Sequence, residues 1–315
     1  MSGAHAHHAH HAAASALTTR AAIASVAMAL FLSGLKSWAA WDTGSAAMLG
    51  SLADTALDLV ASVVTFLGVR YAAQPADDDH RFGHGKAEAL AALFQVVLIA
   101  VSAIGIGWRS ALRLGSDRPT EGLELGIAVS VIAMAATFAL LAYQRFVIAK
   151  TDSVAIETDH VHYQSDLLLN LAVIAALLLD QVAHIRGADA AFGIAIALWL
   201  GWGAWRAAQR AVDQLMDKEW SVEKKQAFLD VALRHPELAG IHDLRTRTSG
   251  GHDFAQFHAW VDPAMTVRDA HRVMDEIEDE LMHAFPGTEV LIHPDPKGHS
   301  DEIGYIPSET VEHRE

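Results

Sequence analysis

Long apolar stretches follow one another from about residue 17 to residue 212, and they constrain the fold more than any other feature. A helix needs roughly 20 mostly apolar residues to cross the hydrocarbon core of a bilayer. Six stretches meet this length, and short breaks that contain glycine, aspartate or proline separate most of them. We therefore predict six membrane-spanning helices, at residues 17–40, 45–72, 88–113, 121–148, 158–182 and 187–211.

The composition supports a membrane protein and removes several classes of function. Only 19% of the 315 residues are charged, whereas soluble proteins average about 25%. The formal net charge of −15 argues against nucleic acid as a partner, because the phosphate backbone repels an acidic protein. The sequence contains no cysteine, which excludes disulfides, thiolate metal sites and cysteine nucleophiles.

An even number of spans places both ends of the chain on one side of the membrane. Basic residues in and near the short loops number eight on the side of the termini and five on the other side. Because cytoplasmic loops carry the excess of Lys and Arg, we expect both termini in the cytoplasm.

Beyond residue 213 the sequence becomes charged and periodic, as expected for a small soluble domain. Ser221 and Thr266 are typical residues for the start of a helix, and three stretches between and after these helices predict strands. The order αββαβ indicates an α+β domain, with strands near 239–248, 253–262 and 288–293. We expect a histidine-rich N-terminal tail at 1–16, a transmembrane domain at 17–212, a cytoplasmic domain at 213–297 and a polar tail at 298–315.

Two aspartates, Asp54 and Asp58, lie inside the second predicted span, four residues apart and therefore on one helical face. Each ionisable residue at mid-membrane costs roughly 2.5–3.5 kcal/mol even on the mildest scale. The fifth span repeats the pattern with His162 and Asp166. Together the four side chains form a nitrogen and oxygen ligand set that suits tetrahedral Zn²⁺ or a similar divalent cation. Polar contacts between helices and a proton relay without metal are the alternatives.

The same ligand set suggests a driving force for transport. A vacant site with three carboxylates and an imidazole holds protons, and a cation must displace them because metal ligands bind in their deprotonated form. If the bundle opens alternately to each side of the membrane, this competition couples metal movement one way to proton movement the other way.

The loop after the second span contains a second group of potential ligands. Asp77, His80 and His84 can bind a metal ion and leave one coordination position open. Solvated acidic loops often contain the same residues, so both interpretations stay open at this point.

The start of the fifth span carries three further polar residues, Glu157, Asp159 and His160. They lie within about one turn of the predicted helix start at residue 158. We expect them to be solvated residues of a helix end.

Four ordered motifs resemble the cation diffusion facilitator family and, within it, the bacterial ferrous-iron/zinc efflux pumps. The resemblance covers about residues 15–297. The motifs are Asp54-x-x-x-Asp58, Gln74-Pro75-Ala76-Asp77-Asp78, Phe82-Gly83-His84-Gly85-Lys86-Ala87-Glu88 and His162-Tyr163-Gln164-Ser165-Asp166.

This resemblance implies a homodimer in the bacterial inner membrane, in which each protomer has six spans and a metallochaperone-like cytoplasmic domain. Its transport site maps to Asp54, Asp58, His162 and Asp166, and its loop site to Asp77, His80 and His84. A two-metal site at the cytoplasmic dimer contact maps to His242, His258, His271, His293 and Asp295. Without the resemblance, the four histidines of this cytoplasmic site would be interpreted as scattered surface residues.

We therefore expect a secondary transporter, not an enzyme, that exports Zn²⁺ and accepts Cd²⁺ and Fe²⁺ as further substrates. Zn²⁺ would also serve as a structural or regulatory ion, and the partners would be lipid, divalent cations and protons. One alternative is a metal sensor whose helices only anchor it. Another is a membrane hydrolase that uses His162 and Asp166, although no strained serine motif accompanies these residues.

Overall fold

The computed structural model describes residues 2–43, 46–113, 124–183, 188–299 and 310–312. The chain divides into two compact units. One unit is helical and contains residues 15–212, and the other contains residues 213–315 together with the first 14 residues.

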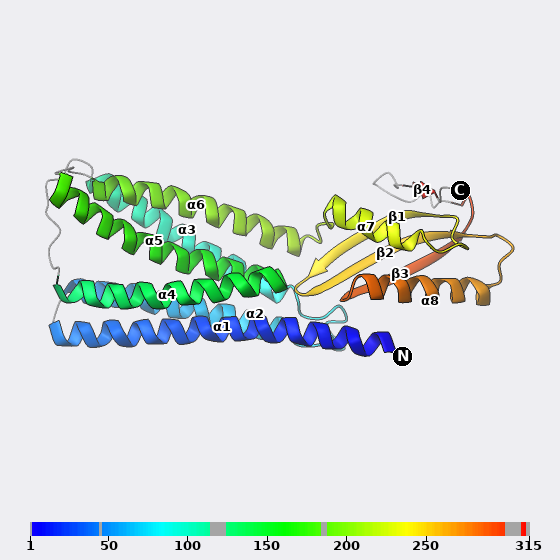
Figure 1. Cartoon of the computed structure of the whole chain (residues 1–315), viewed down its shortest axis with the longest axis horizontal. Coiled ribbons are helices and arrows are strands. Elements are labelled where there is room, and N and C mark those ends of the chain that lie inside the picture. Colours follow the sequence, from blue (N-terminus) through cyan, green and yellow to red (C-terminus); the bar gives the residue numbers. More distant parts are fainter. Residues whose placement is uncertain (1, 44–45, 114–123, 184–187, 300–309, 313–315) are drawn as a thin grey trace. The chain divides into compact units, whose positions relative to one another are not determined.

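Six long helices, which run alongside one another in Figure 1, make up the helical unit among the described residues. Five of them contain stretches that are long and apolar enough to cross a membrane. The remaining helix, α5, has 30 residues and packs against α2, α3 and α4. The helices are α1 (Ser2–Thr43), α2 (Ala46–Ala72), α3 (Ala87–Arg113), α4 (Glu124–Thr151), α5 (Val154–Ala183) and α6 (Ala188–Leu215). The predicted membrane bundle is confirmed, and α1 begins within the segment expected to be a tail.

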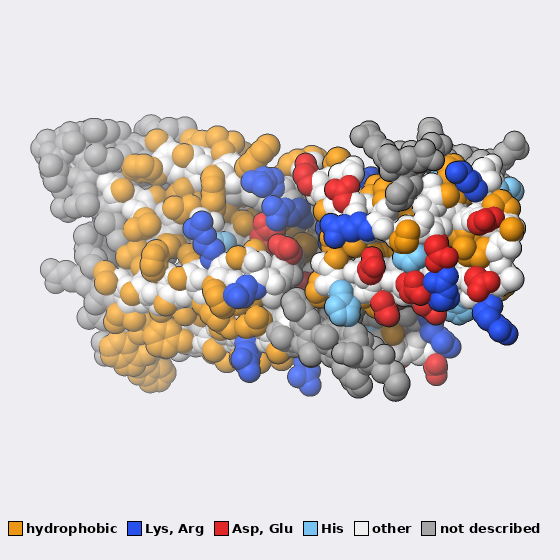
Figure 2. All heavy atoms as spheres, turned by 45° about the vertical axis from the view of Figure 1, so that its right-hand side comes forward, with side chains coloured by type: hydrophobic (Ala, Val, Ile, Leu, Met, Phe, Trp, Pro, Cys, Tyr) orange, Lys and Arg blue, Asp and Glu red, His pale blue; other side chains and the backbone are white. Residues whose placement is uncertain are grey.

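Large apolar side chains point outward from these helices, as expected where the surrounding medium is lipid. Ile104, Trp108 and Leu198 are all at least 68% exposed, and hydrophobic side chains cover much of the helical unit in Figure 2. Many of the buried residues in this unit are alanines, such as Ala61 and Ala92. A Cβ atom at Gly68 of α2 would lie only 2.4 Å from the Cβ of Ala91 of α3, so glycine allows these two helices to approach closely.

The second unit has the predicted αββαβ order. Its elements are α7 (Val222–Ala232), β1 (Gly240–Ser249), β2 (His252–Val261), α8 (Val267–Ala284) and β3 (Thr288–Pro296). Ser221 and Thr266 cap the two helices, because their side chains accept hydrogen bonds from backbone N–H groups three residues later. The apolar face of α8 packs into the core with the sheet, through residues such as Val273, Ile277 and Leu281.

The sheet differs from the prediction at both edges. Its order is β3-β2-β1-β4, in which β1 and β2 are antiparallel and β2 and β3 are parallel. The edge strand β3 continues to Pro296, beyond the predicted end, because an edge strand tolerates prolines that lack an N–H group. The segment predicted as a polar tail contributes β4 (Thr310–Glu312), which pairs with β1 and covers part of its open edge.

Candidate metal sites

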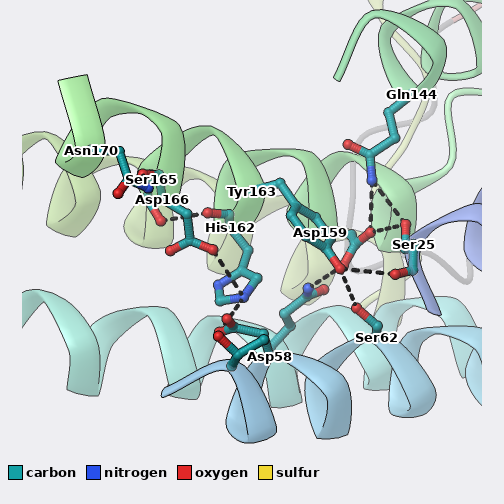
Figure 3. A network of polar contacts seen from close by, with 12 residues as sticks. Ser25, Asp58, Ser62, Gln144, Asp159, His162, Tyr163, Ser165, Asp166 and Asn170 are labelled. Atoms are coloured by element: carbon teal, nitrogen blue, oxygen red, sulfur yellow. Dashed lines mark hydrogen bonds and ion pairs between the residues drawn. The ribbon is translucent and has the colours of Figure 1, made fainter. Parts of the chain in front are cut away.

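Three of the four residues predicted for the transport site converge between α2 and α5 (Figure 3). The Nε2 atom of His162 lies 3.1 Å from Asp58 Oδ1 and 4.0 Å from Asp166 Oδ2. Ligand atoms at about 2.0–2.1 Å from a tetrahedral Zn²⁺ lie about 3.3 Å from one another, close to the shorter of these separations. The His162 side chain is only 9% exposed. The three groups can therefore surround a divalent cation inside the helical unit.

The fourth predicted ligand, Asp54, belongs to α2 and lies one helical turn before Asp58. Its side chain lies outside the described residues. The backbone places it on the same face of α2 as Asp58, so the predicted pairing of these two carboxylates stays a prediction.

The expectation for Asp159 is wrong. It is fully buried, and its carboxylate accepts hydrogen bonds from Ser25 Oγ and Gln144 Nε2 (Figure 3) and from Gln95 Nε2. The error arose because a residue at a predicted helix start was assumed to reach water. Its spacing of three residues from His162 and seven from Asp166 places all three on one face of α5, and this signal was available in the sequence.

The two neighbours of Asp159 behave differently. Glu157 forms an ion pair with Arg210 and stays partly exposed, as expected for a helix end. The Nδ1 atom of His160 lies 3.3 Å from Gln144 Oε1, and the side chain is partly buried.

The predicted loop site lies between α2 and α3. Asp77 contacts both histidines, with Oδ1 3.1 Å from His80 Nδ1 and Oδ2 3.3 Å from His84 Nε2. The hydrogen bond from the backbone N–H of His80, and then the His80 side chain, lowers the pKa of the Asp77 carboxyl. Gly83 takes a positive φ of 77° in the turn before His84, whose side chain is buried. Within the described residues the buried His84 Nδ1 has no hydrogen-bond partner. The three side chains can hold a cation together.

Three histidines stand in register across the sheet of the second unit. His242 on β1 pairs with His258 on β2, and His258 pairs with His293 on β3. Asp295 lies beside them with Oδ2 2.8 Å from His258 Nδ1 and 3.3 Å from His242 Nε2, and with Oδ1 3.4 Å from His293 Nε2. A register shift follows His242, and irregularities of this kind redirect side chains. One buried carboxylate thus faces three imidazoles.

The fifth residue predicted for this cytoplasmic site, His271, is not part of the cluster in this chain. It lies exposed on α8 and pairs with Asp275, whose Oδ1 is 3.0 Å from His271 Nδ1. A groove of about 510 Å³ between α8 and β3 is lined by both His271 and Asp295. Burial, and then the nearby carboxylates of Asp275 and Asp279, raises the pKa of Glu278 in the same groove.

A fourth group of metal-binding side chains was missed by the sequence analysis. His235, Glu237 and Glu276 bring one ligand atom each within 4.8 Å of one another. Arg272 already pairs with both glutamates, at 2.7 Å from Glu237 and 3.0 Å from Glu276. A guanidinium in this position neutralises the carboxylates, so the group is an ion-pair network between α8 and the turn before β1.

Comparison with known proteins gives matches over most of the chain. A family model for the cation efflux transmembrane domain matches residues 22–216, and the model ZT_dimer, for the cytoplasmic domain of cation efflux proteins, matches residues 220–297. The cation-efflux pump FieF of Serratia proteamaculans is 42% identical over 269 residues, which cover 85% of this chain and 89% of the relative. FieF of Yersinia pestis strain Pestoides F is 40% identical over the same shares.

Two solved structures each match about a quarter of this chain. A putative zinc transporter CzrB in its Zn form is 37% identical and covers 27% of this chain and 99% of that chain, with a TM-score of 0.25. The metal-bound C-terminal domain of the CzcD transporter from Thermotoga maritima is 28% identical and covers 25% of this chain and 94% of that chain, again with a TM-score of 0.25.

Proposed function

The chain belongs to the cation efflux family, and we propose that within it the protein exports Zn²⁺, with Cd²⁺ and Fe²⁺ as further substrates, in exchange for protons. Cation efflux across a membrane follows from the family. The observation that carries the finer proposal is the convergence of His162, Asp58 and Asp166 inside the helical unit.

The donor set supports Zn²⁺ over harder cations. Mg²⁺, Ca²⁺ and Mn²⁺ prefer sites made of oxygen, whereas imidazole nitrogen suits Zn²⁺ and its neighbours. His162 provides the nitrogen, and Asp58 and Asp166 provide oxygens within reach of the same ion. We propose Asp54 as the fourth ligand.

Competition between a proton and the cation for His162 Nε2 supports the proposal of proton exchange. The 3.1 Å contact between His162 Nε2 and Asp58 Oδ1 is a hydrogen bond and requires a proton between the two atoms. A metal ion that binds Nε2 must displace this proton. Alternate opening of the bundle to each side would then release the cation where protons are abundant and reload it where they are scarce.

We further propose that the protein is a homodimer in the inner membrane with both termini in the cytoplasm. The match to the ZT_dimer domain supports the dimer, and the excess of basic residues near the loops on the side of the termini supports the orientation. The groove that carries both His271 and Asp295 is the proposed dimer contact, where His271 would complete a two-metal site.

Uptake of ⁶⁵Zn into inside-out vesicles under a pH gradient tests the transport proposal. Asp58→Ala should abolish uptake, because it removes a ligand and the proton acceptor of His162. Asp230→Asn, at an exposed residue of α7, is the matched control and should leave uptake unchanged. Unchanged uptake by Asp58→Ala would leave a metal sensor as the better explanation.

The pH dependence tests the exchange mechanism in the same vesicles. Histidine ordinarily titrates near pH 6.5, and protons should therefore compete with Zn²⁺ when the loading face is below about pH 6. Uptake should fall steeply there. A flat profile from about pH 5 to 8 would contradict proton exchange.

A further inference from the structure

The carboxylate of Asp159 connects α5 to three other helices. Ser25 Oγ of α1 donates to Oδ2 at 2.5 Å, Gln144 Nε2 of α4 donates to the same oxygen at 2.7 Å, and Gln95 Nε2 of α3 donates to Oδ1 at 2.7 Å. These four side chains are called the Asp159 clamp below. Asp159 is the only ionisable residue among them, and all four are fully buried.

Two further hydrogen bonds extend the connection to α2. Thr65 Oγ1 donates to Gln95 Oε1 at 3.1 Å. Tyr163 of α5 donates to the backbone carbonyl of Ser25 at 2.9 Å, which leaves its oxygen to accept from Ser62 Oγ at 2.9 Å. The layer that contains Asp159 therefore links α5, directly or through one intermediate, to each of the first four helices.

A buried carboxylate is expensive, and apolar packing would hold helices together without that expense. The carboxylate instead fixes the orientation of the helix that carries it. A carboxyl group has two oxygens in one plane, and hydrogen bonds to both of them fix where the group points. Three such bonds from three helices therefore fix the rotation of α5 about its axis at Asp159.

That rotation determines where the proposed metal ligands point. His162 lies three residues after Asp159, about 4.5 Å along the axis and on the same side of the helix. Side-chain atoms lie about 5–6 Å from the axis, so turning α5 by about 30° would move them by about 3 Å. A displacement of that size equals the 3.1 Å separation of His162 Nε2 from Asp58 Oδ1 and would break the contact.

We propose that Asp159 is a positioning residue for the transport site, holding α5 in the rotation at which His162 and Asp166 meet Asp58. Asp159 itself does not contact the cation. The inference rests on the proposed transport site, because a clamp for ligands has no role if those residues bind no metal.

Isothermal titration of Zn²⁺ onto the purified full-length protein tests the inference. His80→Ala and His258→Ala in the background weaken the loop site and the cytoplasmic cluster, so that the transport site dominates the signal. Asp159→Asn should raise the Kd of this site by about tenfold or more, as the loss of a residue that orients metal ligands usually does. The control Glu157→Gln, which removes a carboxylate from the same helix outside the clamp, should leave Kd unchanged within about twofold.

An exchange of groups across one hydrogen bond separates positioning from simple loss of structure. In Asp159→Asn combined with Gln144→Glu, the carboxylate moves from α5 to α4. The new asparagine on α5 would still accept from Gln95 and would donate to the new glutamate on α4. That glutamate would also accept from Ser25, so the hydrogen bonds of α5 to α3 and α4 are restored and Ser25 bonds to α4 in place of α5. The double variant should return Kd to within about threefold of the background protein, which the single variants do not.

Three results would reject the positioning role of Asp159. If Asp159→Asn binds Zn²⁺ as tightly as the background, or if the double variant unfolds at the background temperature but is not rescued, Asp159 does not act as a positioning residue. If Asp159→Asn fails to fold, Ser25→Ala removes one donor only, and an unchanged Kd would equally reject the inference. Asp58→Ala in the same background distinguishes the two proposals, because retention of Zn²⁺ binding by that variant would reject the transport site itself.

Discussion

His258 and Asp295 meet across neighbouring parallel strands, with the imidazole Nδ1 2.8 Å from the carboxylate Oδ2. The same carboxylate lies within 3.4 Å of the ring nitrogens of His242 and His293. Asp295 is therefore the common partner of three imidazoles on β1, β2 and β3, and its side chain is only 6% exposed.

Replacement of Asp295 by Asn should weaken Zn²⁺ binding to the cytoplasmic cluster by at least about tenfold, because the charged partner of three histidines is lost. Isothermal titration of the full-length protein measures this change. Asp279→Asn, at an exposed residue of α8, is the control and should bind as the wild type does. Removal of Zn²⁺ by a chelator should also lower the stability of the wild type, by about 2.7 kcal/mol relative to saturation at about 100 times Kd. Equal binding by Asp295→Asn would place the cytoplasmic metal elsewhere.

His162→Asp should relax the choice of transported metal. The proposed site would then consist of oxygen ligands only, which suit Mn²⁺ better than an imidazole does. Competition of Mn²⁺ against ⁶⁵Zn uptake should therefore strengthen, by about tenfold if one ligand dominates the preference. Glu157→Gln is the matched control, since Glu157 lies on the same helix and pairs with Arg210 instead. An unchanged order of metals would show that selectivity lies in other residues.

Gly68→Ala should destabilise the helical unit. The new Cβ would lie 2.4 Å from the Cβ of Ala91, so α2 and α3 must separate, and overpacking of this kind typically costs about 1–3 kcal/mol. Gly34→Ala on α1 is the control, because no atom lies within 4 Å of its added Cβ. Thermal unfolding in detergent should show a lower midpoint for Gly68→Ala only, and equal midpoints would contradict the close approach of α2 and α3.

Glu276 should make the second unit sensitive to acid. The hydrogen bonds from His235 and then Arg272 lower the pKa of the Glu276 carboxyl below its ordinary value of 4.5. A carboxyl with a lowered pKa stabilises the folded state above its ordinary pKa, and this contribution is lost as the pH falls from 4.5 through the lowered value.

Urea unfolding of a fragment of residues 213–315 between about pH 3 and 6 measures this effect. Glu276→Gln should be less stable than the wild type at about pH 6, and the two should converge toward about pH 3. Parallel curves over the whole range would show that the ion-pair network with His235 and Arg272 contributes nothing.

The fold was largely predictable from sequence because its two units have different and strong patterns. Apolar length predicts the helices, and the caps at Ser221 and Thr266 predict α7 and α8 to within one residue at their starts. The strand β4 was not predictable, because three residues in a polar segment carry no periodicity, and their pairing with Gly240–His242 depends on an edge that exists only after folding.

The candidate sites were also predictable only where the signal is local in the sequence. The spacing of four residues within each of two helices predicted Asp58, His162 and Asp166 as metal ligands, and the structure places them together. Asp159 was misjudged because its partners Ser25, Gln95 and Gln144 lie on three other helices, and no local pattern reports contacts between helices. His235 and Glu276 likewise meet only through the packing of α8 on the turn before β1.

The prolines of β3 have a consequence for how two copies of the chain can associate. Lys297 donates its N–H to Val261 of β2, so odd-numbered residues at this end of β3 turn their amides inward, and Pro294 and Pro296 occupy the outward positions. The outer edge of β3 therefore lacks N–H donors at its last two outward positions, and another strand cannot pair with it there. Two copies of the chain therefore cannot extend a shared β-sheet through this end of β3, and their association must use other surfaces.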